Sequence, residues 1–262
     1  MYGRAMHSQE RERLILEALS PSGFVTYREL EARIDASPAT IRRDLTRLEG
    51  AGRIQRVHGG AKLPEDAASG PPGLLGTPFS QAITLNLPAK QAIGRAAAQM
   101  CAPGEGIMID GGTTTLQMCE HLAGKNLQVL TNSLHIVDAL LPLPDARVLL
   151  PSGMVFREQN IVLAPAGEHS MPRFHAPKLF MGAAAVGAQG VMQHDVILVA
   201  AERRFMDQAE QVILMVDSSK FTSSSGAIVC GLEEIDVVIT DAGIPDSARQ
   251  NLEAAGVRLV IA

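Results

Sequence analysis

The apolar positions near the N-terminus recur at the spacing of three short helices. Residues 9–19 place their apolar side chains on one face and predict a first amphipathic helix. Thr26 and Glu29 have the spacing of a capping box, which begins a second helix. A third helix is expected after Ser37, a good N-cap residue, with Pro38 in its first turn. The pattern therefore predicts a small three-helix module.

The third predicted helix has one apolar face and one cationic face. Ile41, Leu45 and Leu48 recur at helical spacing and are expected to face inward. The outer face carries polar and basic side chains, namely Thr40, Arg42, Arg43 and Arg47. A short helix with guanidinium groups near its start fits a DNA major groove, where arginine binds guanine edges or phosphates. We therefore interpret this segment as a recognition helix.

A basic hairpin follows the third helix. Residues 53–57 alternate polar and apolar side chains as a strand does, His58 begins a glycine turn, and residues 61–63 return as a second strand. Such a wing brings basic side chains to the sugar-phosphate backbone. Residues 1–63 are thus predicted to form a winged helix-turn-helix DNA-binding domain. Its expected DNA contacts are Thr40, Arg42 and Arg43 for base reading and Arg47, Arg53, Arg56 and His58 for the backbone.

Beyond residue 88, short apolar runs alternate with helical periods. Strands are predicted at 107–110, 127–131, 147–150, 179–181, 212–216, 236–240 and 257–261, and helices at 90–100, 115–122, 134–141 and 245–255. Strands that are apolar on both faces are typical of a mostly parallel sheet covered by helices. Residues 89–262 are therefore predicted to be an α/β domain. Residues 64–88 are rich in Pro and Gly and show no period, which predicts a linker.

Gly, Thr, Ser and Asn concentrate where the predicted strands end. The five loops are residues 110–115, 131–133, 152–153, 182–183 and 217–220. Ligands of such sheets bind beyond the carboxyl ends of the strands. Glycine-rich loops expose N–H groups that bind anions, and Lys220 could pair with a phosphate. Each loop alone is typical of an ordinary helix cap, but five at one edge favour a small, phosphorylated, hydroxyl-rich ligand.

Charge and composition narrow the class of protein. Residues 1–63 carry 11 Lys and Arg against 8 Asp and Glu, a net charge of +3, whereas the remainder carries 12 against 20, a net charge of −8. The acidic part should repel phosphate and leave one face for DNA. No apolar run is long enough to cross a membrane, and no signal-peptide pattern is present.

The cysteines, histidines and glycines argue against a disulfide-bonded, a metal-binding or a dinucleotide-binding protein. The three cysteines, Cys101, Cys119 and Cys230, are far apart in apolar surroundings and predict reduced core thiols of a cytoplasmic protein. The histidines lack ligand spacing and the glycines lack a dinucleotide-binding pattern, so neither a metal nor a cofactor is expected.

Two sets of motifs run through the chain. The first is Ser37-Pro-Ala-Thr-Ile-Arg-Arg-Asp-Leu45, continuing to His58-Gly-Gly-Ala61. The second is Ile109-Asp-Gly-Gly-Thr-Thr-Thr115, Leu130-Thr-Asn-Ser-Leu134, Phe180-Met-Gly-Ala183 and Asp217-Ser-Ser-Lys-Phe221. With these motifs the chain resembles, over about residues 8–262 apart from the linker, the DeoR family of sugar-catabolism repressors.

The resemblance implies a sensor domain related to ribose-5-phosphate isomerase and sugar-phosphate deaminases, in which a phosphosugar effector tunes operator affinity. By position, the effector contacts would fall on Asp110, Gly112, Thr113, Thr114, Thr115, Asn132, Ser133, Gly182 and Lys220. Two places depart from the family pattern. Ser152-Gly153 replaces a Gly-Gly pair, and Ala200-Ala-Glu-Arg-Arg-Phe205 replaces a Glu-x-x-Lys motif, so no ligand role is assigned to Glu202 or Arg203.

Two function classes remain open at this point. The leading one is a ligand-responsive repressor that reads two half-sites of double-stranded operator DNA as a homodimer or homotetramer, although residues cannot separate a repressor from an activator. The alternative is a sugar-phosphate isomerase or deaminase fused to a DNA-binding module. Asp110, Glu202 and Lys220 are its candidate acid–base residues. No tight carboxylate–histidine grouping is expected beside them, which favours a protein that is not an enzyme.

Overall fold

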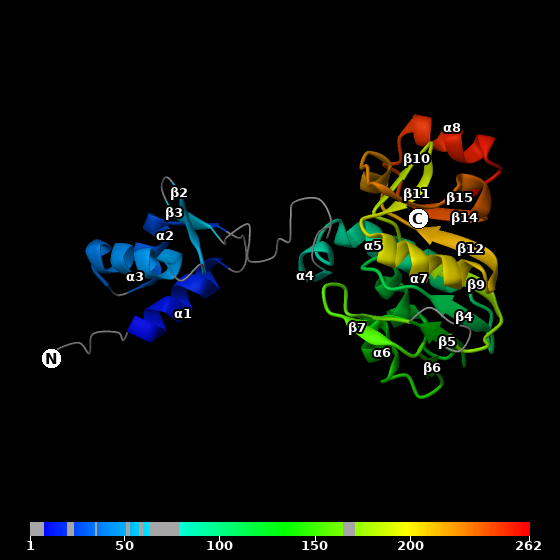
Figure 1. The fold of residues 1–262 in the computed structure, drawn as a ribbon, viewed down its shortest axis with the longest axis horizontal. Helices are drawn as coiled ribbons and strands as arrows, with labels where there is room; N and C mark the ends of the chain where they lie inside the picture. The colour runs from blue at the N-terminus through cyan, green and yellow to red at the C-terminus, as the bar shows by residue number, and fades with distance from the viewer. Residues whose placement is uncertain are drawn as a thin grey trace. The chain divides into compact units, whose positions relative to one another are not determined.

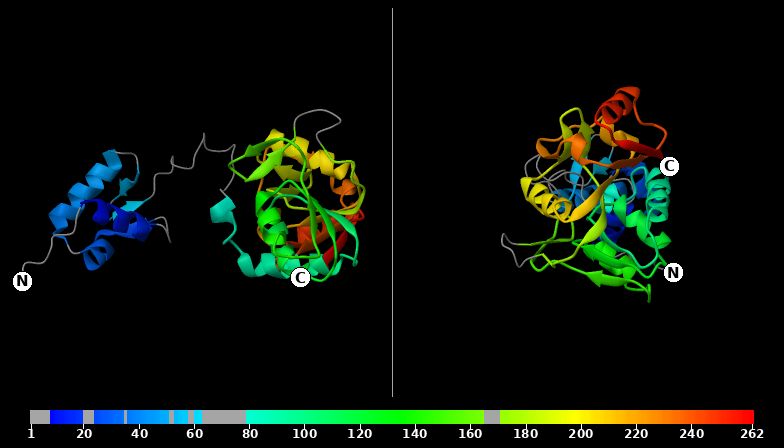
Figure 2. Two further views of the ribbon diagram at one scale, coloured as in Figure 1. Left: turned by 90° about the horizontal axis from the view of Figure 1, so that it is seen from below. Right: turned by 90° about the vertical axis from the view of Figure 1, so that its right-hand side faces the viewer.

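The computed structural model describes residues 8–19, 24–34, 36–50, 53–57, 60–62, 79–164 and 171–262. The chain divides into two compact units, residues 1–72 and residues 73–262 (Figures 1 and 2). His58, which we expected to contact DNA, lies outside the described residues, as do residues 64–78 of the predicted linker.

The N-terminal unit combines helices with a small antiparallel sheet (Figure 1). Its helices are α1 (Ser8–Leu19), α2 (Tyr27–Arg33) and α3 (Pro38–Gly50), and its strands are β1 (Phe24–Thr26), β2 (Gln55–Val57) and β3 (Gly60–Lys62). The strand order is β1-β3-β2. The three predicted helices and the hairpin are confirmed. Strand β1 was not predicted, because three residues between two helices carry no readable period.

Side-chain caps begin the two later helices as predicted. Thr26 Oγ1 accepts a hydrogen bond from the Glu29 N–H at 3.2 Å, and the Glu29 carboxylate accepts one from the Thr26 N–H at 2.8 Å. Ser37 Oγ accepts from the Thr40 N–H at 3.2 Å at the start of α3. The apolar faces of the helices meet in one core, which contains Ile15, Leu19, Leu30, Ile34, Ile41, Leu45 and Leu48.

Gly60 is required by a close approach between β3 and β1. A Cβ atom on Gly60 would lie 2.1 Å from the backbone oxygen of Val25. We expect Gly60→Ala to lower the free energy of unfolding of this unit by about 1–3 kcal/mol, the usual cost of overpacking. Denaturant unfolding of the full chain checks this. Gly50→Ala is the matched control, because nothing lies within 4 Å of its added Cβ, and equal stability of the two variants would contradict the prediction.

The C-terminal unit is built on a seven-stranded sheet in the order β15-β14-β12-β9-β4-β5-β6, in which every pairing is parallel. In chain order the strands are β4 (Gly106–Ile109), β5 (Gln128–Thr131), β6 (Arg147–Leu149), β9 (Ala176–Met181), β12 (Ala209–Met215), β14 (Val237–Thr240) and β15 (Arg258–Ile261). All seven predicted strands are confirmed. The α/β class with a mostly parallel sheet is therefore confirmed.

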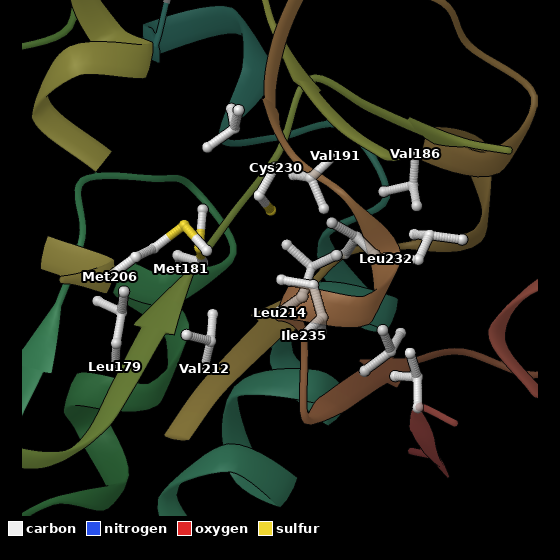
Figure 3. Packing of buried hydrophobic residues seen from close by; sticks show 14 of the residues in the cluster. Leu179, Met181, Val186, Val191, Met206, Val212, Leu214, Cys230, Leu232 and Ile235 are labelled. Carbon is white, nitrogen blue, oxygen red and sulfur yellow. The ribbon is translucent and has the colours of Figure 1, made fainter. Parts of the chain in front are cut away.

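Both faces of this sheet are covered. On one face lie α5 (Leu87–Gln99), the 3₁₀ helix η2 (Thr115–His121) and α6 (Leu134–Leu140), and on the other lie α7 (Val196–Met206) and α8 (Asp246–Ala254). Alternate residues of each strand point to opposite faces of the sheet. Ile107 and Ile109 belong to the first core, on the side of α5, and Met108 belongs to the second core, on the side of α7. Figure 3 shows part of the second core, with Leu179 and Val212 beside Met206.

Four features of this unit were not predicted, and the first is helix α7 (Val196–Met206), which is absent from the expected helices. A small antiparallel sheet joins β10 (Ala185–Gly187), β11 (Gly190–Gln193) and β13 (Ala227–Cys230), and β7 (Met154–Phe156) pairs with β8 (Ile161–Leu163) as a hairpin. Helix α4 (Phe79–Ala82) lies inside the range expected to be linker, and α5 begins two residues before the expected domain start. The strands of the small sheet and of the hairpin lie outside the alternation of strand and helix that identifies the parallel sheet, and α4 follows a Pro- and Gly-rich stretch.

The cysteines agree with the expectation of buried thiols. All three cysteines are buried and unpaired, and burial raises the pKa of each thiol to about 12. No helix in the described ranges is long and apolar enough to span a lipid bilayer.

Candidate DNA-contacting surface and ligand pocket

Four of the predicted DNA-contacting residues lie on one surface of the N-terminal unit. A shallow depression is lined by Arg42, Arg43, Thr46, Arg47 and Arg56. Arg42 and Arg43 are exposed on α3, and among the described residues neither guanidinium has a hydrogen-bond or ion-pair partner. Both are therefore free to contact a ligand.

Arg47 is engaged within the unit. Its Nε atom lies 2.9 Å from Glu12 Oε1, and its Nη2 donates to Asp44 Oδ1. Asp44 is buried and also accepts from Arg11 Nε at 2.7 Å. These ion pairs tie α1 to α3 and compensate the buried charge of Asp44, which would be costly alone. Part of the Arg47 guanidinium is thus used internally, and its contact with a DNA phosphate stays a prediction.

Arg56 of the wing is fixed beside α3. Its Nη1 donates to Thr46 Oγ1 at 3.0 Å, and its backbone N–H donates to Glu49 Oε1 at 3.0 Å. A hydrogen bond with Tyr27 raises the pKa of Arg56 above its usual value. These contacts hold a cation of the wing next to the cationic face of the helix.

The remaining predicted contacts are less constrained. Thr40 is half-buried, and its hydroxyl lies 2.9 Å from the Ser37 hydroxyl. Arg53 is exposed.

A polar pocket lies at the carboxyl ends of β4, β5 and β9 in the C-terminal unit. Seven of the nine predicted effector residues line it, namely Asp110, Gly112, Thr113, Thr114, Asn132, Gly182 and Lys220. The loops that follow four different strands, β4, β5, β9 and β12, therefore converge there, as the sequence predicted from the parallel sheet.

Thr115 and Ser133, the other two predicted residues, do not line the pocket but shape its loops. Thr115 Oγ1 donates to the carbonyl oxygens of Asp110 at 2.8 Å and Gly112 at 3.0 Å. Ser133 Oγ accepts from the Ile136 N–H at 3.4 Å and caps α6. Both hydroxyls are therefore satisfied within the protein.

Asn132 connects two of the converging loops. Its Nδ2 donates to Asp110 Oδ1 at 3.0 Å, and its Oδ1 accepts from the Gly111 N–H at 3.0 Å. Burial raises the pKa of Asp110 to about 6, opposed by the hydrogen bonds from Asn132 and Gly111.

Glu202 on α7 also lines this pocket, although the departure of its segment from the family pattern had given no reason to assign it a ligand role. The side chain is buried, its Oε1 accepts from Gln193 Nε2, and its Oε2 has no hydrogen-bond partner in the described part of the chain. Burial and the charge of Asp110 raise the pKa of Glu202 well above its usual range. Arg203 turns away and pairs with Glu234, Nη1 to Oε2, at 2.6 Å.

His194 lies in the same lining as both carboxyl groups. Burial and the charge of Lys220 lower the pKa of this histidine. The sequence led us to expect no tight carboxylate–histidine grouping beside Asp110 and Glu202, and the structure places His194 in the same pocket lining as both. Sequence spacing could not reveal the grouping, because the three residues come from different elements.

The loop of residues 152–153 does not reach the pocket, so four of the five expected loops converge. A Cβ on Gly153 would lie 2.0 Å from the Leu163 backbone oxygen, because this glycine packs within the β7–β8 hairpin. Gln159 and Ile161 of that hairpin line the pocket instead.

Helix α4 supplies one wall that the sequence did not indicate. Phe79 and Ala82 line the pocket, and the Phe79 ring stacks on His135 with centroids 4.0 Å apart. The buried Lys90 donates its Nζ hydrogen bond to the Ala82 carbonyl oxygen, and burial lowers the pKa of this lysine. Phe79 escaped prediction because it follows a Pro- and Gly-rich stretch without period.

Comparison with known protein families gives two matches. Residues 11–67 match the family model of the DeoR-like helix-turn-helix domain, and residues 85–242 match that of the DeoR C-terminal sensor domain. These ranges contain the depression around Arg42 and most of the pocket lining, respectively.

Relatives of the whole chain are similar in length. The HTH-type transcriptional regulator UlaR of Shigella dysenteriae serotype 1 is 30% identical over 256 residues, covering 97% of this chain and 99% of that one. UlaR of Escherichia coli strain K12 / DH10B gives the same identity and coverage. Among solved structures, the full-length sorbitol operon regulator SorC of Klebsiella pneumoniae is 13% identical with a TM-score of 0.41, over 92% of this chain and 98% of that one.

Proposed function

Because the chain belongs to the DeoR family of transcriptional regulators, we propose that it represses a sugar-catabolism operon. In this proposal, a phosphorylated sugar bound in the pocket changes the affinity of the N-terminal unit for operator DNA. The protein acts as a homodimer or homotetramer and does not turn its ligand over. The observation that carries the proposal is the pairing, in one chain, of a cationic helix surface with a polar pocket suited to a hydroxyl-bearing anion.

The pocket chemistry supports a ligand of this class. Lys220 offers a positive charge for a phosphate, and residues 112–114 offer backbone N–H groups and threonine hydroxyls. Asp110 and Glu202 offer carboxyl oxygens for sugar hydroxyls. A phosphorylated, hydroxyl-rich molecule satisfies both kinds of group.

Selection of DNA from a random pool, followed by titration with sugars, tests this function. We expect the full chain to enrich a sequence with two related half-sites. At least one phosphorylated sugar should change the affinity for that sequence by about ten-fold or more, a typical allosteric coupling. The dephosphorylated sugar at the same concentration is the control. Failure to enrich any sequence would contradict the DNA-binding part of the proposal.

The grouping of Asp110, Glu202, His194 and Lys220 in one pocket gives the alternative, an isomerase or deaminase, a specific observation in its favour. Incubation with ribose 5-phosphate and with glucosamine 6-phosphate, followed by chromatography, distinguishes the two. Product would support the enzyme. Binding without product would support the sensor.

Helix α4 offers a route from the pocket to DNA. Its residues Phe79 and Ala82 line the pocket, and the chain before residue 79 leads to the N-terminal unit. A ligand that contacts α4 would change its position or its mobility, and thereby the tether between the two units. We therefore propose that α4 transmits ligand occupancy.

Phe79→Ala tests this route. We expect the variant to keep operator affinity without ligand but to lose most of the ligand-induced change, because the stacking on His135 that holds α4 is removed. Fluorescence anisotropy with operator DNA, with and without ligand, measures both quantities. Leu85→Ala, at an exposed residue just beyond α4, is the control. An unchanged ligand response in Phe79→Ala would exclude α4 as the route.

Arg56→Ala should weaken binding to every DNA sequence about equally, because we expect this residue to contact phosphate. The slope of log Kd against log salt concentration should fall by roughly one. Arg56→Lys keeps the charge and should keep the slope. A loss confined to the selected sequence would instead assign Arg56 to base reading.

A further inference from the structure

Glu202 has a buried oxygen that the protein leaves unused. The side chain is 3% exposed and lies in the pocket lining on α7. Gln193 Nε2 donates to Oε1, whereas Oε2 has no hydrogen-bond partner among the described residues. Buried polar atoms are nearly always hydrogen-bonded, so an unpaired buried oxygen on a residue that lines a pocket points to a ligand as its partner.

The groups around Glu202 and Asp110 determine which of the two carboxyl groups is protonated. Asp110 accepts a hydrogen bond from Asn132 Nδ2, and the neighbouring Gly111 N–H also stabilises its negative charge. Glu202 has only the Gln193 amide, and two carboxylates in one buried pocket cannot both ionise freely. Burial and Asp110 raise the pKa of Glu202 well above its usual range.

The other titratable groups around Glu202 do not reverse the rise in its pKa. Cys230 of β13 has its pKa raised to about 12 by burial, and burial lowers the pKa of His194, so both favour their neutral forms. Lys220 is the remaining cation of the pocket lining. The proton therefore belongs on Glu202, and Asp110 carries the charge.

We propose that neutral Glu202 selects the effector by donating a hydrogen bond from its free oxygen to a carbonyl oxygen of the sugar, while Asp110 accepts one from a hydroxyl. The inference rests on the proposed function of the pocket. It narrows the ligand class to a phosphorylated sugar that presents a carbonyl group beside a hydroxyl group, a ketose or an open-chain aldose. The corresponding alditol phosphate has no carbonyl group and should bind less tightly.

Calorimetry on the full chain tests the selection with matched ligands. The probes are ribulose 5-phosphate and fructose 6-phosphate, each compared with its reduced form, ribitol 5-phosphate and glucitol 6-phosphate. We expect wild type to bind at least one of the carbonyl forms about ten-fold more tightly than its alditol. Glu202→Leu should remove this preference, and Glu202→Gln should retain most of it, because the amide N–H₂ still donates. Glu210→Gln, at an exposed residue of β12, is the control.

The pH dependence separates a proton donor from a merely structural residue. The Glu202 proton is present below its pKa, so wild-type affinity should fall as pH rises through that pKa, by up to about ten-fold per pH unit. Glu202→Gln carries no such proton and should lack this fall over the same range. The second ionisation of the ligand phosphate affects both proteins and cancels in the comparison.

Several results would overturn the inference. One is Glu202→Leu binding the carbonyl forms with wild-type preference, and another is Glu202→Gln showing the wild-type pH profile. Thermal unfolding of each variant checks that it is folded; an unfolded Glu202→Leu leaves the Gln comparison decisive. Suppose that wild type binds none of the four phosphorylated probes and that no other phosphorylated sugar changes its affinity for operator DNA. The proposed phosphosugar function is then contradicted, and this inference, which rests on it, is contradicted with it.

Discussion

Replacing Arg42 and Arg43 together by alanine is expected to reduce affinity for operator DNA by about 10²–10⁴-fold. A base-contacting arginine contributes about 1–3 kcal/mol, and two separate contacts should add approximately. Both side chains are exposed on α3, and neither guanidinium is used in a described contact within the protein. Their removal should therefore leave the free energy of unfolding unchanged, which distinguishes a loss of recognition from a loss of structure.

Anisotropy with the selected operator and with a random duplex measures this effect. Binding to the random duplex should fall much less, because phosphate contacts supply most non-specific affinity. Each single variant should also relax base preference at one position of the site. Arg33→Ala, which removes an exposed cation from α2, is the control. Equal losses on operator and random duplex would refute base reading by these arginines.

Lys220→Ala is expected to weaken binding of a phosphorylated sugar by about 10–100-fold. A hydrogen bond to a charged group contributes about 1.5–3 kcal/mol, and Lys220 is the cation of the pocket lining. Its removal should also let the pKa of His194 rise, because the charge of Lys220 lowers that pKa. Calorimetry and NMR titration of the histidine measure the two effects.

The ligand without its phosphate provides the sharpest control for Lys220. The weak binding of a dephosphorylated sugar should be the same in Lys220→Ala and wild type. Operator affinity in the absence of ligand should also be unchanged, since Lys220 lies in the C-terminal unit. Arg258→Ala, at an exposed cation of β15, controls for net charge. An equal loss for both forms of the sugar would show that Lys220 does not bind the phosphate.

The parts of the fold that could be predicted are those whose apolar residues recur with the spacing of a helix or a strand. The strands of the parallel sheet are apolar on both faces, as in residues 107–109, and stand out from their surroundings. The capping box at Thr26 marks a helix start unambiguously, since two hydrogen bonds depend on two residues three apart. The β7–β8 hairpin and the small second sheet were missed, because their strands lie outside the alternation of strand and helix by which the parallel sheet is recognised.

The pocket was predictable only where it is made of loops. Residues 110–114 and Asn132 could be predicted because glycine, threonine and asparagine follow a strand there. Glu202 and Phe79, in contrast, belong to helices, and loop composition does not identify them. Which helical side chain faces a pocket depends on tertiary packing. The same reason explains Arg47, whose pairing with Glu12 of α1 could not be deduced from α3 alone.

The three buried thiols are all in the C-terminal unit, at positions 101, 119 and 230. A thiolate forms from such groups only when the surrounding structure opens, so alkylation kinetics should report the opening of this unit without interference from the other. An effector that stabilises the C-terminal unit against opening would slow alkylation of these thiols. The rate of alkylation of the unmodified protein would therefore report whether the effector is bound. The same burial should protect this regulator from oxidants that inactivate proteins with exposed cysteines.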